Sequence, residues 1–397
     1  MRYRLETERV DLFDANILIV MNVKIDKEVP FEELKTSFER ACKLHEVLRS
    51  KVVIEPSGEA YYVDNDEPHN SIIRTDSSME ELICNNERRR FRIEEGEYIR
   101  AFLSPDGLVF MMHHLGGDGK SLLYFIETFM KCLANEEVHE VPFRNLPFDD
   151  IPVISRLSFG YRLLTRYWNR KWTGQERICS FQDMDDEYSG FWKDRKTRVS
   201  VRRYEKDELD ALLRKSKAMG VSLTSYMITG FIKDSGRKMS IGIAADGRQD
   251  DNRSMGNQVT GIAIKVRYDN RKSFEDNARR VDHLMRKKLS DPRRRYFSLQ
   301  FMRHLEPTLK DALNLNRAGF TDNGFVSMVA GYLGYGKKIR DMSFTNLTRA
   351  DIRLRYGGYE IKEIVFVPPI VSYAKDVIGI ITTGDIMNVT RHVYDKK

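Results

Sequence analysis

Residues 111–119 read Met-Met-His-His-Leu-Gly-Gly-Asp-Gly, and no other stretch of the sequence says more about the fold. An apolar strand pattern from Leu108 leads into the two histidines, and an amphipathic helix pattern begins after the glycines. Because adjacent residues of a strand point to opposite faces, His113 and His114 are not expected to act on one substrate or to bind one metal. Asp118 stands where a helix N-cap belongs, and the glycines permit a tight turn. The stretch predicts a strand–turn–helix unit in which one histidine enters a site and the other is structural.

A histidine placed directly before the start of a helix is suited to act as a general base. The positive end of the helix favours the neutral imidazole, which is the form that accepts a proton. The alternative interpretation is that His113, His114 and Asp118 only satisfy buried polar groups and cap the helix. The nine residues by themselves are consistent with both interpretations.

Strand and helix patterns alternate along the whole chain. Apolar, β-branched segments predict strands at 15–25, 98–103, 108–114, 198–204, 239–244, 258–268, 361–367 and 377–394. Amphipathic patterns predict helices between them, including continuous helices over 273–290 and 294–314. The polar, acidic segment 173–189 is expected to be the crossover between two similar-sized halves, residues 1–180 and 190–397. The predicted fold class is therefore α/β or α+β.

Composition excludes several classes of protein. The 397 residues carry a net charge of +7, which is too small by itself to indicate a nucleic-acid binder. The longest apolar run, residues 17–21, is far shorter than a membrane span, and no apolar signal core follows the charged start. The four cysteines lie far apart without CxxC spacing, which is typical of reduced thiols. We expect a soluble, cytoplasmic protein.

Two further kinds of site are disfavoured. The histidines outside positions 113 and 114 lack the spacing of metal ligands, so no metal site is expected. Residues 331–338 read Gly-Tyr-Leu-Gly-Tyr-Gly-Lys-Lys, without the Ser or Thr that completes a P-loop. This stretch is expected to be a loop.

The pattern HHxxxDG at 113–119, with its strand before and helix after, resembles the active-site motif of the chloramphenicol acetyltransferase-like superfamily. That superfamily includes condensation domains of peptide synthetases, alcohol O-acyltransferases and wax ester synthases. Further segments resemble its landmarks in the same order: Leu48-Arg49-Ser50, Phe91-Arg92-Ile93, Tyr98-Ile99-Arg100, Asp246-Gly247-Arg248, Met255-Gly256-Asn257, Ser343-Phe344-Thr345-Asn346-Leu347 and Val365-Phe366-Val367-Pro368-Pro369. One departure is Thr348, which stands where the superfamily's SNxG strand has its glycine.

The resemblance implies two mixed-sheet subdomains with an active-site tunnel between them. It also implies that His114 is the catalytic base and that His113 supports the strand. Gly119 would permit close packing at the turn. Asp118 would be structural and paired with an arginine of the other half, for which Arg248 is the best match.

Three more residues are implied as candidate contacts of a substrate or an oxyanion. They are Asn257, Thr345 and Asn346, of which the last two lie next to the departure at Thr348.

The activity that the resemblance implies is acyl transfer. An acyl group would move from a CoA or carrier-protein thioester to an alcohol or amine acceptor, with His114 as general base and no covalent acyl-enzyme. Acyl-CoA or a phosphopantetheine thioester would be the co-substrate, and no tightly bound cofactor is expected. Two alternatives stay open: a stand-alone condensation-type enzyme that joins carrier-bound substrates, and a non-catalytic binding homologue of the fold.

The basic excess is concentrated in one segment. Residues 279–303 hold nine basic and two acidic residues, an excess equal to the whole net charge. This segment is either a solvated helix face or a docking site for the phosphates of CoA or for an acyl carrier protein. The candidate docking residues are Arg286, Lys287, Lys288, Arg293, Arg294 and Arg295. Nucleic acid is not an expected partner, because no binding motif accompanies the cluster.

Overall fold

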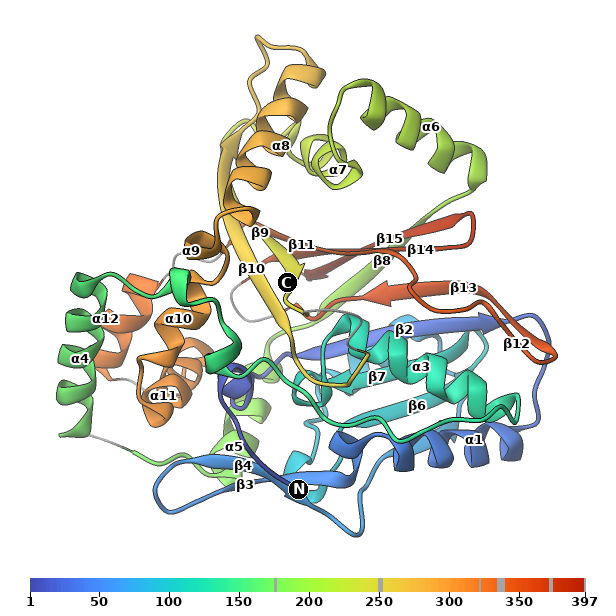
Figure 1. The fold of residues 1–397 in the computed structure, drawn as a ribbon, viewed down its shortest axis with the longest axis horizontal. Helices are drawn as coiled ribbons and strands as arrows, with labels where there is room; N and C mark the ends of the chain where they lie inside the picture. Colours follow the sequence, from blue (N-terminus) through green and yellow to red (C-terminus); the bar gives the residue numbers. More distant parts are fainter. Residues whose placement is uncertain (175–176, 249–252, 321–322, 334–339, 371–373, 396–397) are drawn as a thin grey trace.

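The computed structural model describes residues 1–397 apart from 175–176, 249–252, 321–322, 334–339, 371–373 and 396–397 (Figure 1). Within the described residues, two six-stranded sheets and one three-stranded sheet are surrounded by helices. The mixed α/β class predicted from the sequence is confirmed.

The first six-stranded sheet has the order β12-β13-β2-β7-β6-β5, with β5 parallel to β6 and the other neighbours antiparallel. Its strands are β2 (Leu18–Ile25), β5 (Ser71–Arg74), β6 (Ile99–Ser104), β7 (Gly107–His113), β12 (Arg355–Tyr356) and β13 (Tyr359–Val367). Helices α1 (Phe31–Leu44) and α3 (Gly119–Leu133) pack together along it. Phe125 of α3 contacts Phe38 of α1 and Phe110 of β7 edge-on, which places the aromatic core under the strand that ends in the histidines.

The second six-stranded sheet has the order β10-β9-β11-β14-β15-β8, with β11 parallel to both of its neighbours. Its strands are β8 (Thr197–Tyr204), β9 (Lys238–Asp246), β10 (Val259–Arg267), β11 (Met342–Arg349), β14 (Asp376–Thr383) and β15 (Ile386–Tyr394). Helices α6 (Lys206–Ala218), α7 (Leu223–Ile232) and α8 (Phe274–Leu289) cover it (Figure 1). A separate apolar core joins these helices to the sheet.

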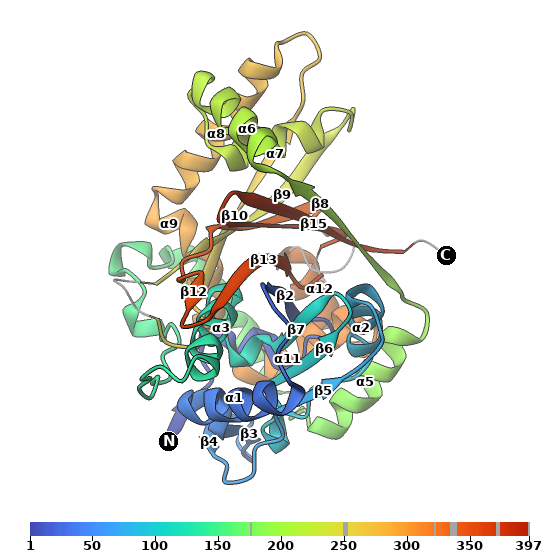
Figure 2. The same ribbon diagram turned by 90° about the vertical axis from the view of Figure 1, so that its right-hand side faces the viewer.

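The C-terminal part of the chain contributes two strands to the first sheet. Both β12 and β13 come from the C-terminal part of the chain, yet β13 pairs with β2 over six registered positions (Figure 2). The expected division into 1–180 and 190–397 stays a prediction, and the sheet of the first part is completed by the second. A small sheet of β1 (Arg2–Arg4), β4 (Ala60–Asp64) and β3 (Ser50–Ile54), together with α2 (Met79–Asn86), completes the N-terminal part.

A group of helices stands at one end of the molecule (Figure 1). It consists of α4 (Phe159–Thr173), α9 (Pro292–Arg295), α10 (Phe297–Arg303), α11 (Pro307–Ala318) and α12 (Gly324–Leu333). The prediction of one continuous helix over 294–314 is wrong. Pro307 has no amide hydrogen and begins α11, and Glu306 before it is extended, so the helix breaks there.

The expected polar crossover at 173–189 contains the start of a helix that the sequence analysis did not predict. Helix α5 (Phe181–Lys193) begins at a capping box formed by Ser180 and Asp183. Met184, Phe191 and Trp192 lie on its buried face, and of its acidic residues Asp186 is exposed while Glu187 is buried. The acidic composition concealed a one-sided apolar pattern.

Candidate active site

The turn between β7 and α3 positions the two histidines. Strand β7 ends at His113, and His114 begins a short 3₁₀ turn, so His114 does not lie on the strand as expected. Gly117 follows with φ +149°, and a Cβ atom there would lie 2.4 Å from Cβ of Ser121. A glycine is therefore required at this position for the helix to start so close to the strand.

His113 is buried and structural. Its Nδ1 accepts a hydrogen bond from the backbone N–H of Leu115 at 3.1 Å, which fixes the turn. Burial lowers the pKa of His113 to about 3, so the ring is neutral at pH 7. The ring also packs edge-on against Phe91.

Asp118 and Arg248, which the sequence analysis expected to pair, are in direct contact. Arg248 donates Nη1–H to Oδ2 of Asp118 at 2.8 Å and Nη2–H to Oδ1 at 2.9 Å. Both side chains are buried, and Asp118 also caps α3 by accepting from the backbone N–H of Ser121 at 3.0 Å. The backbone N–H of Gln258 donates to the same carboxylate at 3.0 Å. We call this bidentate pair the Asp118–Arg248 clamp, because it ties the start of α3 to the loop between β9 and β10.

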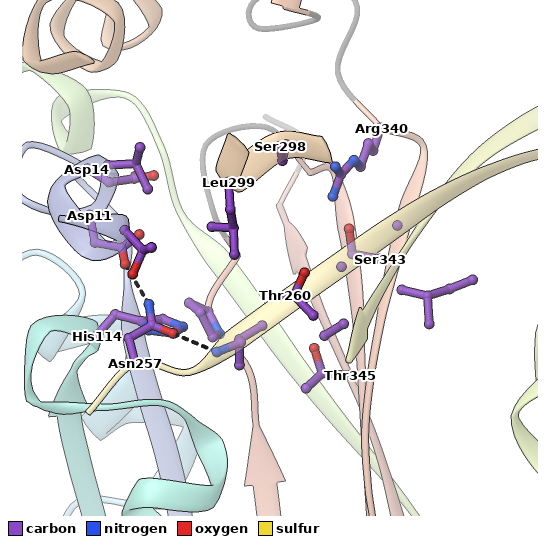
Figure 3. Close-up of a pocket in the computed structure, with 18 of the residues that line it drawn as sticks. Asp11, Asp14, His114, Asn257, Thr260, Ser298, Leu299, Arg340, Ser343 and Thr345 are labelled. Atoms are coloured by element: carbon purple, nitrogen blue, oxygen red, sulfur yellow. Dashed lines mark hydrogen bonds between the residues drawn. The ribbon is translucent and has the colours of Figure 1, made fainter. Parts of the chain in front are cut away.

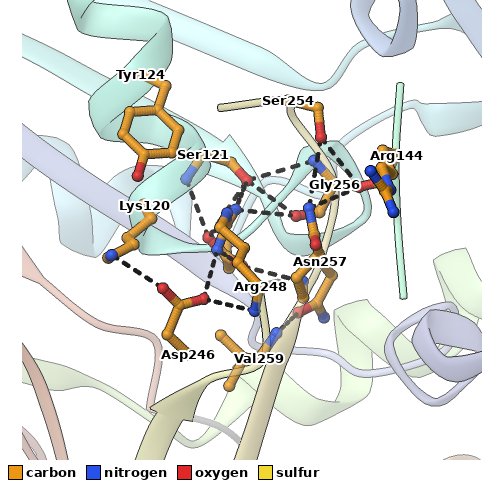
Figure 4. Close-up of polar contacts among 12 residues, drawn as sticks. Lys120, Ser121, Tyr124, Arg144, Asp246, Arg248, Ser254, Gly256, Asn257 and Val259 are labelled. Carbon is orange, nitrogen blue, oxygen red and sulfur yellow. Dashed lines mark hydrogen bonds and ion pairs between the residues drawn. The ribbon is translucent and has the colours of Figure 1, made fainter. Parts of the chain in front are cut away.

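Further polar contacts surround the clamp (Figure 4). The Ser121 hydroxyl accepts from Nη2 of Arg248 at 2.9 Å and donates to the carbonyl of Gly256 at 2.9 Å. Lys120 pairs with Asp246 at 2.9 Å. The sequence analysis missed Ser121 and Lys120, although a serine three residues after an N-cap aspartate is a recognisable capping pattern.

A cavity of about 550 Å³ lies between the two halves (Figure 3). His114 and Gly119 contribute from the first half, and Ile243, Thr260 and Ser343 contribute from strands β9, β10 and β11. Residues of the end helices, among them Tyr161, Phe297 and Tyr332, also line it. The structure thus brings the predicted base to a cavity at the interface of the halves.

His114 is half-buried in the cavity wall. Its Nδ1 is buried and has no hydrogen-bond partner among the described residues. Nε2 is not enclosed in this way, and we take it as the nitrogen that a substrate in the cavity can reach.

The remaining predicted contacts divide into two groups. Asn257 and Thr345 line the cavity, although the Asn257 amide also donates to Asp11 at 2.8 Å. Asn346 is not among the described lining residues, and its amide donates to Thr224 of α7 at 2.9 Å. A substrate contact by Asn346 stays a prediction that this placement does not support, because a bulge in β11 follows this residue and its amide is used within the second half.

Gly119 packs as the sequence analysis expected. A Cβ atom at this position would lie 3.2 Å from the Phe366 ring and 3.3 Å from Leu347. A side chain at this position would fit only if the Phe366 ring or the Leu347 side chain shifted by a few tenths of an ångström.

The basic segment is partly engaged within the chain. Arg286 pairs with Asp282, Lys288 donates to the carbonyl of Ala263, and Arg295 donates to the carbonyl of Asp246. The exposed members are Arg286, Lys287, Arg293 and Arg294, of which Arg294 pairs with Asp291. Docking of a thioester carrier at this segment stays a prediction.

Two other expectations concern sites elsewhere. In the part of the chain that the structure describes, no group of three or more His, Cys, Asp or Glu side chains could hold a metal ion. The expected loop at 331–338 lies largely outside the described residues, since 334–339 are not described.

Comparison with known proteins defines the class of fold. No protein-family model and no curated protein sequence matches the chain. The first condensation domain of the calcium-dependent antibiotic synthetase, in complex with a substrate analogue, is similar with a TM-score of 0.63 at 14% identity, over 99% of this chain and 91% of that one. Trichothecene 15-O-acetyltransferase from Fusarium sporotrichioides is similar with a TM-score of 0.63 at 11% identity, over 100% and 91%.

A third solved structure is polyketide synthase associated protein 5 from Mycobacterium tuberculosis, with a TM-score of 0.59 at 13% identity, over 99% of this chain and 93% of that one. The chain therefore has the fold shared by condensation domains and this acetyltransferase. The resemblance inferred from the sequence is confirmed at the level of the fold.

Proposed function

We propose that the protein is an acyltransferase that uses His114 as its general base. The observation that carries the proposal is the position of His114 in the wall of the cavity between the halves, directly before the clamped start of α3. An acyl group would pass from a CoA or carrier-protein thioester to an alcohol or amine acceptor.

The proposed reaction needs one base and no covalent acyl-enzyme. His114 takes the proton from the acceptor as its oxygen or nitrogen attacks the thioester carbonyl carbon. The tetrahedral intermediate collapses, the C–S bond breaks, and the imidazolium returns the proton to the leaving thiolate. Holding both substrates in one cavity supplies the proximity that direct transfer requires.

The other site residues act on His114 or on the substrate. The clamp fixes the turn that carries His114, and His113 holds the same turn through Leu115. Asn257 and Thr345 line the cavity and are the proposed contacts of the acceptor or the oxyanion. The co-substrate is a thioester of CoA or phosphopantetheine, with no tightly bound cofactor.

The test is a purified-enzyme screen read by mass spectrometry. Acyl-CoAs are incubated with pooled alcohols and amines, and the His114→Ala variant is compared with wild type. Loss of the general base is expected to lower turnover about a hundredfold or more. The matched control is His139→Ala, an exposed histidine outside the cavity lining, which should retain wild-type turnover. Unchanged turnover in His114→Ala would reject the base assignment.

A second candidate is condensation between carrier-bound substrates, which the fold of the condensation domains favours. Replacing free acyl-CoA with an acylated carrier protein in the same screen separates the two. Turnover of the carrier-bound thioester alone would favour condensation. Binding of substrates without turnover of either thioester would indicate a non-catalytic homologue.

A further inference from the structure

Helix α4 presents an unusual outer face. Its buried side carries Thr165, Trp168 and Trp172, which pack on the end helices. The opposite side should be polar in a helix that faces only water. Instead, Phe159 is 68% exposed, Leu163 44% and Tyr167 54%.

Arginine side chains lie between these apolar groups. Positions 159, 163, 166, 167 and 170 recur at helical spacing, so they share one face. Arg162, Arg166 and Arg170 are all exposed, and α4 contains no acidic residue. We call this surface the α4 face: Phe159, Leu163, Tyr167 and the three arginines.

The side of α4 opposite the α4 face reaches the cavity. Tyr161 of the same helix lines the cavity and packs edge-on against Phe297, which also lines it. Tyr332 of α12 lines the cavity, is largely exposed, and contacts Trp168 of α4. Figure 1 shows α4 at the outer edge of the end helices, away from both large sheets.

We propose that the α4 face docks on an anionic lipid bilayer. Exposed aromatic and aliphatic groups beside arginines match the region where headgroups meet acyl chains. The arginines complement anionic headgroups. Within the described residues no helix is long and apolar enough to cross a bilayer, so this contact would be peripheral.

The proposal does not depend on the proposed function, because binding is measured without substrate. Full-length protein is floated with vesicles of phosphatidylcholine alone, or of two parts phosphatidylcholine to one part phosphatidylglycerol. Binding is expected to the anionic vesicles and to weaken in high salt, which screens the arginines.

Two variants divide the contributions. Arg166→Glu with Arg170→Glu is expected to lower the partition coefficient on anionic vesicles at least about tenfold. Leu163→Ser with Tyr167→Ser is expected to lower binding to a similar degree and to leave its salt dependence in place. The matched control on α6, Leu213→Ser with Arg214→Glu, removes one exposed leucine and one exposed arginine elsewhere and should bind as wild type.

Circular dichroism checks that every variant is folded. The proposal is wrong if wild type does not float with anionic vesicles, or if the two α4 variants float as well as the control. It is also wrong if the protein binds only an acidic carrier protein through this face. A dimer in light scattering that the α4 variants dissociate, without vesicle binding, would instead make the face a protein interface.

Discussion

Individual side chains fix the geometry around His114. The carboxylate of Asp118 receives two hydrogen bonds from Arg248 and one each from the backbone of Ser121 and Gln258. The Asp118 and Arg248 side chains are both buried, so water does not replace a hydrogen-bond partner that a mutation removes. The position of His114, the proposed base, therefore depends on a buried carboxylate that is paired with an arginine.

Removing the carboxylate tests the clamp. Asp118→Ala leaves the Arg248 guanidinium buried without its main partner and is expected to lower the free energy of unfolding by about 3–5 kcal/mol. Denaturant unfolding measures it, and folded yield and activity should fall together. The control Asp385→Ala breaks an exposed pair with Lys206 and should cost about 1 kcal/mol or less. A fully stable but inactive Asp118→Ala would contradict the structural role.

A second residue-scale prediction concerns His45. This histidine is completely buried, neither ring nitrogen has a partner among the described residues, and burial lowers its pKa to about 3. Between that value and the unfolded pKa of about 6.5, the unfolded chain binds a proton that the folded chain does not. The free energy of unfolding should therefore decrease as the pH is lowered below about 6.5, and His45 should account for a loss of about 2 kcal/mol at pH 5.

His45→Leu removes this proton-binding difference. The variant should be at least as stable as wild type at pH 7 and lose less stability than wild type at pH 5, as measured by denaturant unfolding at both values. Part of the pH dependence will persist in the variant, because the pKa of His113 is also lowered in the folded protein. Identical pH profiles for wild type and His45→Leu would refute the assignment.

At the scale of elements, the unit β7–turn–α3 is the part that delivers the base. Two glycines allow this unit to pack closely against the second half. Gly117 has φ +149°, and Gly256 has φ +144° with the carbonyl of Arg144 2.4 Å from where a Cβ would stand. Both positions lie beside the clamp, so backbone strain there would move the start of α3.

Alanine at these positions tests the requirement. Gly117→Ala is expected to cost about 2–4 kcal/mol of stability and to lower turnover, since strain and overlap with Ser121 must both be relieved. Thermal unfolding and the acyl-transfer assay measure the two effects. Gly230→Ala, inside α7 with open space at the Cβ position, should instead be neutral or slightly stabilising. A neutral Gly117→Ala would show that the turn tolerates a side chain.

At the scale of the whole molecule, the halves depend on each other. Strand β13 completes the first sheet, and the buried pair of Arg9 with Asp311 joins the N-terminal segment to α11. The cavity takes its walls from both parts. We therefore expect the chain to unfold as one cooperative unit.

Cutting the chain at the expected boundary tests this dependence. Residues 1–180 and 181–397, expressed separately, should each lack a cooperative thermal transition, because β2 loses its neighbour β13 and β13 loses its sheet. Mixing or co-expressing the fragments should restore one transition near that of the intact chain. Two separate cooperative transitions would establish independent domains.

The sequence by itself determined the local unit around the histidines. The strand pattern, the glycines and the N-cap Asp118 lie within a few residues of one another, and their signals are read from neighbours in the chain. It also determined the α/β class, because strand and helix periodicities differ. Where local signals compete, the interpretation failed: amphipathic spacing concealed the break at Pro307, and acidic composition concealed α5.

Local sequence patterns do not show which distant groups meet. The pairing of Asp118 with Arg248, 130 residues away, was expected only from the resemblance, and only the tertiary structure decided the placement of β13 beside β2. The apolar outer face of α4 was hidden as well, because its pattern does not tell which aromatics pack inward and which stay exposed. Whether a side chain is buried or exposed depends on its contacts with segments far away in the sequence, and these contacts form only when the core is assembled.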